Sequence, residues 1–124
     1  VTLSTAVGAD DLKPQEIRIE ASEYQFTPSQ ASLKELHPVV LTIVNTGKVT
    51  HEFESQLFYG GEARVEVDGV AVLADEVGEI ELKPGKSVTI RFVPRKKGAI
   101  EFMCNAEDPT DHFKKGMKGT IKIE

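Results

Sequence analysis

Several short stretches of the chain have the residue pattern of β-strands. Residues 16–21 and 87–93 alternate polar and apolar positions, and residues 39–44 are mostly β-branched. Residues 99–103 and 120–123 have similar patterns. Turn residues separate these stretches at intervals of about 8–12 residues, as in β-sandwiches, and no segment has a clear helical period. The pattern predicts an all-β chain folded as an antiparallel sandwich.

Residues 64–73 have two interpretations. Alternating residues flank Asp68-Gly69, a dipeptide that favours a tight hairpin turn. The stretch therefore predicts a hairpin. A short helix over residues 71–77 is the alternative.

The 124 residues fit one domain, and no linker or internal repeat divides them. We expect a flexible N-terminal segment over residues 1–15 and a single domain over residues 16–124. Val7-Gly8-Ala9 resembles the small-residue end of a secretory signal peptide, which predicts export to the periplasm. A flexible N-terminus without that role is the alternative.

Composition excludes several classes of protein. The hydrophobic fraction of 40% and the charged fraction of 28% are those of a globular chain rather than a disordered one. The net charge of −5 argues against nucleic-acid binding, which needs a basic face. No apolar run is long enough to form a transmembrane helix. Cys104 is the only cysteine, so no internal disulfide can form.

The candidate chemistry lies between the last two predicted strands. Cys104, His112 and Met117 follow one another there in the spacing Cys-x7-His-x4-Met, and His51 stands just after the turn that ends the strand at 39–44. Two imidazoles, a thiolate and a weak thioether are the ligands of a type 1 copper site. Zinc usually takes another Cys or His in fourth place. Each residue alone is more typical of core or surface, but their joint order predicts a metal site.

Two further residues of ligand type lie outside this pattern. His37, beside Pro38, is interpreted as an exposed loop residue. Met103 directly precedes Cys104, so strand alternation places its side chain on the opposite face. Neither is expected to bind the metal.

The chain resembles small bacterial cupredoxins of the plastocyanin and azurin family, from about Glu16 to Glu124. The segments that carry the resemblance are Phe26-Thr27-Pro28, Val44-Asn45-Thr46-Gly47, Leu82-Lys83-Pro84-Gly85, residues 98–104 and the ligand loop itself. The resemblance implies a cupredoxin-like Greek-key β-sandwich that binds one copper ion. It also implies His51, Cys104 and His112 as equatorial ligands and Met117 as the axial ligand.

Two features depart from the pattern of that family. Glu52 follows the first histidine where many members have Asn, so it is a candidate to contact the ligands, with a solvated surface Glu as the alternative. Asn105 is a second such candidate. Seven residues separate Cys104 from His112, more than in plastocyanin or azurin, which predicts a somewhat distorted and greener copper site.

The leading functional hypothesis is a monomeric, periplasmic one-electron carrier. By the resemblance, His112 would lie at the solvent edge beside the apolar Phe113 and pass electrons to a cytochrome or a copper oxidoreductase. Lys114, Lys115 and Lys118 would form a basic rim that steers an acidic partner. A solvated lysine cluster is the alternative, because acidic residues on the same loop partly cancel its charge.

Other functions remain as alternatives. One is copper binding for tolerance, sequestration or delivery in the periplasm. Another is an accessory role in iron uptake, because residues 51–54 look like a segment of cupredoxin-like iron-transport proteins. Enzymatic activity is not expected, since copper oxidases and nitrite reductases carry a His next to the type 1 Cys, where this chain has Met103 and Asn105.

Overall fold

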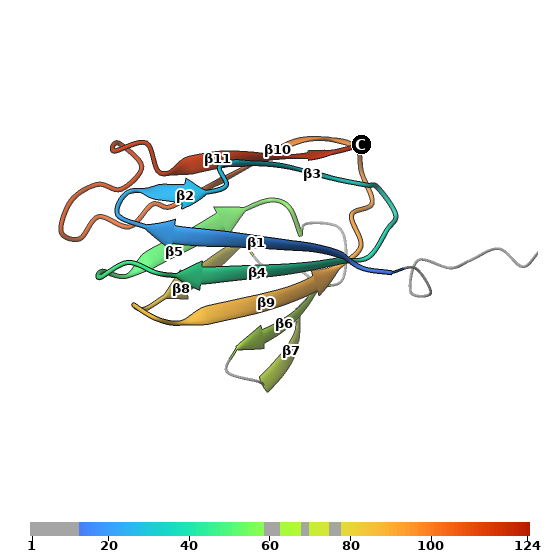
Figure 1. Cartoon of the computed structure of the whole chain (residues 1–124), viewed down its shortest axis with the longest axis horizontal. Coiled ribbons are helices and arrows are strands. Elements are labelled where there is room, and N and C mark those ends of the chain that lie inside the picture. The colour runs from blue at the N-terminus through green and yellow to red at the C-terminus, as the bar shows by residue number, and fades with distance from the viewer. Residues whose placement is uncertain (1–12, 59–62, 68–69, 75–77) are drawn as a thin grey trace, which may run out of the picture.

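A computed structural model describes residues 13–58, 63–67, 70–74 and 78–124. Within these ranges the chain forms eleven β-strands and no helix, so none of the described residues belongs to a helix that could cross a membrane (Figure 1). The strands are β1 (Gln15–Ser22), β2 (Gln25–Thr27), β3 (Gln30–Leu33), β4 (Val39–Asn45), β5 (His51–Ser55), β6 (Ala63–Val67), β7 (Val70–Ala74), β8 (Glu79–Leu82), β9 (Ser87–Phe92), β10 (Gly98–Met103) and β11 (Lys118–Ile123).

The strands form two sheets that pack as a sandwich. One sheet has the order β2-β1-β4-β9-β6-β7 and the other β3-β11-β10-β5-β8. The all-β sandwich is confirmed, but the expectation of a purely antiparallel one is wrong, because β1 pairs with β4 and β3 with β11 in parallel. After β1 the chain turns back through β2 and crosses to β3 in the other sheet, so it returns to β4 running in the same direction as β1.

The hairpin predicted around residues 64–73 is confirmed. Strands β6 and β7 pair antiparallel, with Val67 opposite Val70. A helix over the first part of 71–77 is therefore wrong, since β7 extends to Ala74. The turn residues Asp68 and Gly69, like residues 75–77, lie outside the described residues, as do residues 1–12 of the expected flexible segment.

Three phenylalanines form an aromatic group in the core beneath one end of the sandwich. The rings of Phe53 and Phe102 stack with centroids 5.2 Å apart, and Phe26 meets Phe102 edge to face at 5.0 Å. A side chain at Gly119 on β11 would collide with the ring of Phe102, which lies opposite it on β10, so glycine permits this close packing. Phe102 and Cys104 are two residues apart and both fully buried, so the aromatic group and Cys104 belong to the same core.

Three connecting segments meet at the same end of the sandwich. They are the β1–β2 turn, the β4–β5 turn and the long loop from β10 to β11, all at the left in Figure 1. This end therefore gathers residues that are far apart in the sequence, His51 and Cys104 among them.

Candidate metal centre

The position of His51 is fixed by a buried asparagine at the end of β4. The Asn45 amide donates hydrogen bonds to the carbonyls of Val49 and Leu82, each at 2.8 Å, and its oxygen accepts one from the Gly47 amide at 2.9 Å. Asn45 is fully buried, so these bonds are shielded from water. They hold the β4–β5 turn against β8 and so determine where β5 begins, at His51.

The loop that carries the other predicted ligands is tied at its base by its own backbone. The Cys104 amide donates to the Met117 carbonyl at 3.1 Å, and the Met117 amide donates to the His112 carbonyl at 3.2 Å. The His112 amide in turn bonds the Ala106 carbonyl at 3.0 Å. Cys104, His112 and Met117 are all fully buried. The last turn of the loop therefore returns the chain to Cys104 and brings the three side-chain positions together.

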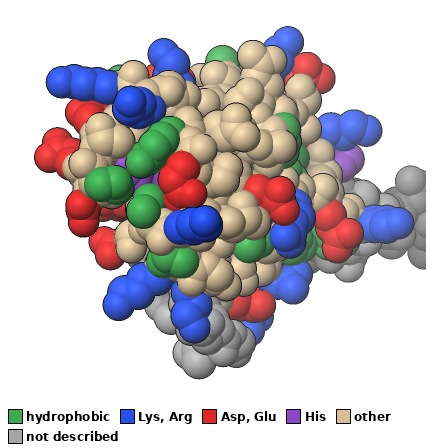
Figure 2. Space-filling view, turned by 60° about the vertical axis from the view of Figure 1, so that its left-hand side comes forward, with side chains coloured by type: hydrophobic (Ala, Val, Ile, Leu, Met, Phe, Trp, Pro, Cys, Tyr) green, Lys and Arg blue, Asp and Glu red, His purple; other side chains and the backbone are tan. Residues whose placement is uncertain are grey.

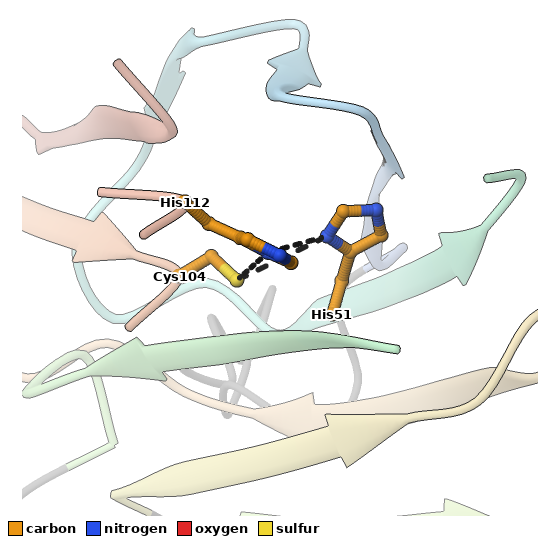
Figure 3. Close-up of side chains that lie close together, drawn as sticks. All are labelled: His51, Cys104 and His112. Carbon is orange, nitrogen blue, oxygen red and sulfur yellow. Dashed lines mark hydrogen bonds between the residues drawn. The ribbon is translucent and has the colours of Figure 1, made fainter. Parts of the chain in front are cut away.

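Three donor atoms converge at this point (Figure 3). The Nδ1 atoms of His51 and His112 are 3.2 Å apart, and the Cys104 Sγ lies 4.0 Å from the first and 3.3 Å from the second. A point equidistant from the three atoms lies about 2.1 Å from each, close to metal bond lengths of about 2.0–2.1 Å for imidazole nitrogen and about 2.3 Å for thiolate sulfur. The three side chains fit a single metal ion without rearrangement.

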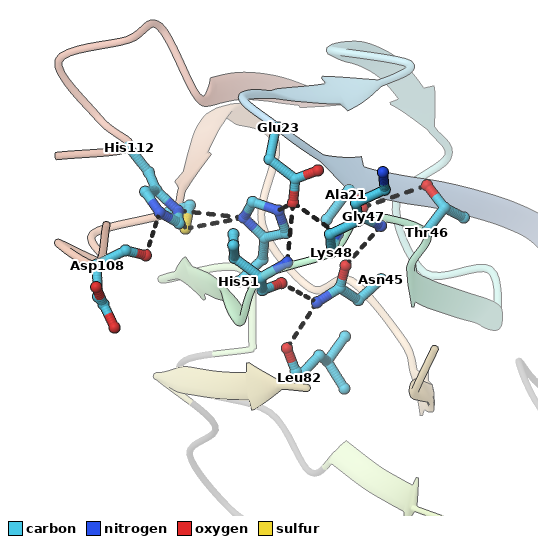
Figure 4. A network of polar contacts seen from close by, with 12 residues as sticks. Ala21, Glu23, Asn45, Thr46, Gly47, Lys48, His51, Leu82, Asp108 and His112 are labelled. Atoms are coloured by element: carbon cyan, nitrogen blue, oxygen red, sulfur yellow. Dashed lines mark hydrogen bonds and ion pairs between the residues drawn. The ribbon is translucent and has the colours of Figure 1, made fainter. Parts of the chain in front are cut away.

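The outer nitrogens of both imidazoles face hydrogen-bond acceptors (Figure 4). His51 Nε2 lies 3.0 Å from a carboxylate oxygen of Glu23, and His112 Nε2 lies 2.9 Å from the Asp108 carbonyl. Neither a carboxylate nor a carbonyl can donate, so each neutral ring carries its proton on Nε2. Both Nδ1 atoms consequently present lone pairs to the same point, as ligation of one cation requires.

Burial sets the protonation of the donor group before metal binds. It raises the pKa of the Cys104 thiol, against the opposing effect of the Glu52 backbone amide, which donates to Sγ at 3.2 Å. Burial also lowers the pKa of His51, although the hydrogen bond to Glu23 opposes this. The metal-free group is thus a thiol beside a neutral imidazole. Binding of a metal must displace the thiol proton.

Glu52 and Asn105, the two residues predicted to contact the ligands, make different contacts. The backbone of Glu52 contacts the Cys104 sulfur, as described, whereas its side chain lies near three other glutamates across the β5–β8 pair. Burial and the nearby Glu79, Glu81 and Glu54 together raise the pKa of Glu52 to about 7. The exposed Asn105 amide bonds the Glu54 carboxylate and so links the start of the loop to β5.

Replacing Glu52 with glutamine should stabilise the metal-free protein at alkaline pH. Because the pKa of Glu52 is above its ordinary value of 4.5, the ionised side chain is disfavoured in the folded state. Its contribution to stability is present below pH 4.5 and is lost as the pH rises through 7. With allowance for partial solvation, we expect Glu52→Gln to raise the free energy of unfolding by about 2 kcal/mol at pH 8 and hardly at all at pH 4.5.

Urea denaturation at the two pH values measures this difference. The control is Glu101→Gln, which removes a carboxylate from an exposed position on β10. Equal effects of the two substitutions at pH 8 would contradict the raised pKa of Glu52.

The expected exposure of His112 is wrong. Its side chain is fully buried, because the Tyr24 ring packs edge-on against it with centroids 4.9 Å apart and Asp108 covers Nε2. Phe113, 41% exposed, and Lys114, Lys115 and Lys118 are among the side chains that reach solvent at this end. The Lys118 ammonium lies 5.7 Å from the centroid of the Phe113 ring. Figure 2 shows this end, where apolar side chains lie among both acidic and basic ones.

Sequence reasoning missed two residues that contact the imidazoles. Glu23 and Tyr24 lie in the β1–β2 turn, remote in sequence from His51 and His112. Their only signal is that they interrupt an alternating stretch, which is typical of any turn. His37 is half-buried and lies outside the donor group, and Met103 is half-buried between the fully buried Phe102 and Cys104.

Comparison with known proteins supports the fold over nearly the whole chain. The family model described as a cupredoxin-like domain matches residues 1–122. No curated protein sequence is significantly similar. Among solved structures, auracyanin B is similar with a TM-score of 0.60 and 17% identity, covering 91% of this chain and 91% of its own. A dithionite-reduced auracyanin from Roseiflexus castenholzii has a TM-score of 0.61 and 19% identity, covering 88% and 96%.

Larger copper enzymes contain a similar domain. A copper nitrite reductase from Nitrosomonas europaea has a TM-score of 0.69 and 14% identity, covering 91% of this chain and 50% of its own. A multicopper oxidase from Campylobacter jejuni has a TM-score of 0.65 and 15% identity, covering 90% and 30%. The chain thus spans about a third to a half of these enzymes but nearly all of the auracyanins. At such identities the likeness shows a shared fold alone.

Proposed function

The chain belongs to the cupredoxin-like domain family, and from this premise we propose that it is a one-electron carrier with a single copper ion at His51, Cys104, His112 and Met117. The observation that carries the proposal is the convergence of two imidazole lone pairs and one sulfur on a single buried point. When bound, copper supplies a couple between Cu(I) and Cu(II) that suits soft sulfur and imidazole ligands.

The protein's own residues favour rapid electron exchange. His51 begins a strand held by Asn45, and Cys104 and Met117 are joined through the backbone at the base of their loop. Ligands held on such a frame move little between oxidation states, and slight reorganisation favours electron transfer. Complete burial of the donor side chains excludes water from the metal.

A carrier is favoured over an enzyme by what surrounds the sulfur. Met103 and Asn105 flank Cys104, so neither neighbour can ligate a second copper centre through an imidazole. His37 is the one histidine left over, which is too few for a three-histidine centre within this chain.

We place the docking surface at the tip of the ligand loop, around Phe113, Lys114, Lys115 and Lys118. The partner would be an acidic redox protein such as a cytochrome or a copper oxidoreductase, met by a monomeric carrier in the periplasm. Because His112 is buried, electrons would cross the shell that Tyr24 and the loop form over it. Transient redox encounters need only a small contact surface of this kind.

The burial of His112 also favours a second candidate function. A covered imidazole slows exchange with a partner but protects bound copper, which suits a protein that sequesters or delivers copper. The two candidates therefore differ in the rate of electron exchange.

Voltammetry of the copper-loaded protein, with stopped-flow oxidation of a reduced acidic cytochrome, tests the proposal. A carrier should give a reversible one-electron wave and rapid oxidation that slows as salt is added, because the lysines attract an acidic partner. Tight copper binding with a sluggish, irreversible wave would contradict the carrier and support copper storage. The visible spectrum of the same sample tests the greener site expected from the long loop.

A further inference from the structure

The carboxylate of Glu23 lies in a pocket formed by the β4–β5 turn (Figure 4). One of its oxygens accepts hydrogen bonds from the backbone amides of Lys48, at 2.9 Å, and Val49, at 3.1 Å. The same oxygen accepts the His51 Nε2 proton at 3.0 Å. A side chain at Gly47 would collide with this carboxylate, so the turn leaves room for it through glycine. Two backbone donors and the space at Gly47 therefore hold Glu23 in position for its contact with His51, which does not depend on a single bond between flexible side chains.

The two imidazoles of the site differ in their outer partners. His51 donates to a carboxylate, whereas His112 donates to the neutral carbonyl of Asp108. A carboxylate on the far N–H of a ligating imidazole fixes the ring orientation and makes the ligating nitrogen a stronger donor. A stronger donor stabilises Cu(II) more than Cu(I), because the ion of higher charge gains more from it.

We propose that Glu23 is a positioning residue for the copper site, which orients His51 and shifts the copper equilibrium toward Cu(II). This inference rests on the copper site of the proposed function. It adds to that site a residue from the turn between β1 and β2. It makes the β1–β2 turn part of the metal centre: Glu23 holds one imidazole from outside, and the adjacent Tyr24 covers the other.

The test compares Glu23→Gln with Glu20→Gln in the full chain. Both substitutions remove one negative charge, but Glu20 lies on β1, paired with Arg18 and not with the imidazole. Cu(II) and Cu(I) affinities are measured by chelator competition, and the reduction potential by voltammetry. We expect Glu23→Gln to weaken Cu(II) binding by about 10- to 100-fold, to change Cu(I) binding less, and to raise the potential. Glu20→Gln should change the Cu(II) and Cu(I) affinities by less than about twofold each, and so should hardly change the reduction potential.

A second measurement does not depend on the variant folding. In the Cu(I) form of the unaltered protein, NMR should show a His51 Nε2 proton that exchanges slowly with water. Absence of this signal, or equal affinities and potentials for Glu23→Gln and Glu20→Gln, would overturn the inference. Failure of the unaltered protein to bind copper would overturn the metal site itself. Sluggish voltammetry with an intact Glu23 effect would count against the carrier alone.

Discussion

Replacing Cys104 with serine is expected to abolish the intense visible absorption of the copper-loaded protein. The colour of a type 1 site comes from charge transfer from the thiolate to Cu(II), which an alcohol oxygen does not provide. We expect the absorbance to fall by more than about tenfold and copper binding to weaken. The fold should persist, since the serine side chain is close in size to cysteine. Absorption and electron paramagnetic resonance spectra of the Cu(II) form measure the change.

The matched control for this substitution is Met103→Leu. It removes a sulfur one residue away, from a half-buried side chain between Phe102 and Cys104. Met103→Leu should leave the colour unchanged. Persistence of the full colour in Cys104→Ser would show that the sulfur does not bind copper.

Replacing Met117 with leucine should keep the colour and raise the reduction potential. Met117 is fully buried, and its backbone joins Cys104 to His112, so an apolar side chain of similar size can occupy its place. Loss of a weak axial thioether removes a donor that helps to stabilise Cu(II), which shifts the equilibrium toward Cu(I). The rise should be the largest change in potential among the substitutions considered for this site.

Voltammetry of Met117→Leu measures the rise, and Met103→Leu again serves as control because its thioether is expected to be remote from copper. An unchanged potential in Met117→Leu would contradict an axial role. A bleached protein would indicate instead that the loop needs methionine to keep Cys104 in place.

Much of the fold could be predicted from local pattern, and the exceptions have physical reasons. The β6–β7 hairpin is confirmed because its turn and flanking alternation agree. The parallel pairs were missed because alternation shows which face of a strand is buried but not the direction of its neighbour. The bounds of β5 were not predicted because His51 and Ser55 occupy buried positions, where strand prediction expects apolar residues.

In the candidate site, too, some residues could be predicted from the sequence and others could not. Cys104, His112 and Met117 share one loop, so their order there, together with His51 and the family resemblance, predicted them as ligands. Glu23 and Tyr24 reach the site only through the tertiary packing of the β1–β2 turn, which no local pattern describes. The same packing explains why His112 is buried although its neighbour Phe113 is exposed.

The ligand loop offers a place to add recognition segments. Its base is tied between Cys104 and Met117, and His112 is held by the carbonyls of Ala106 and Asp108. Glu107 lies between those two carbonyls and is exposed. Lengthening an already closed loop costs little, about 0.6 kcal/mol of entropy for each doubling. A peptide grafted beside Glu107 would therefore cost little entropy, but it would separate the two carbonyls that hold His112, so a change of partner made there would also change the metal site.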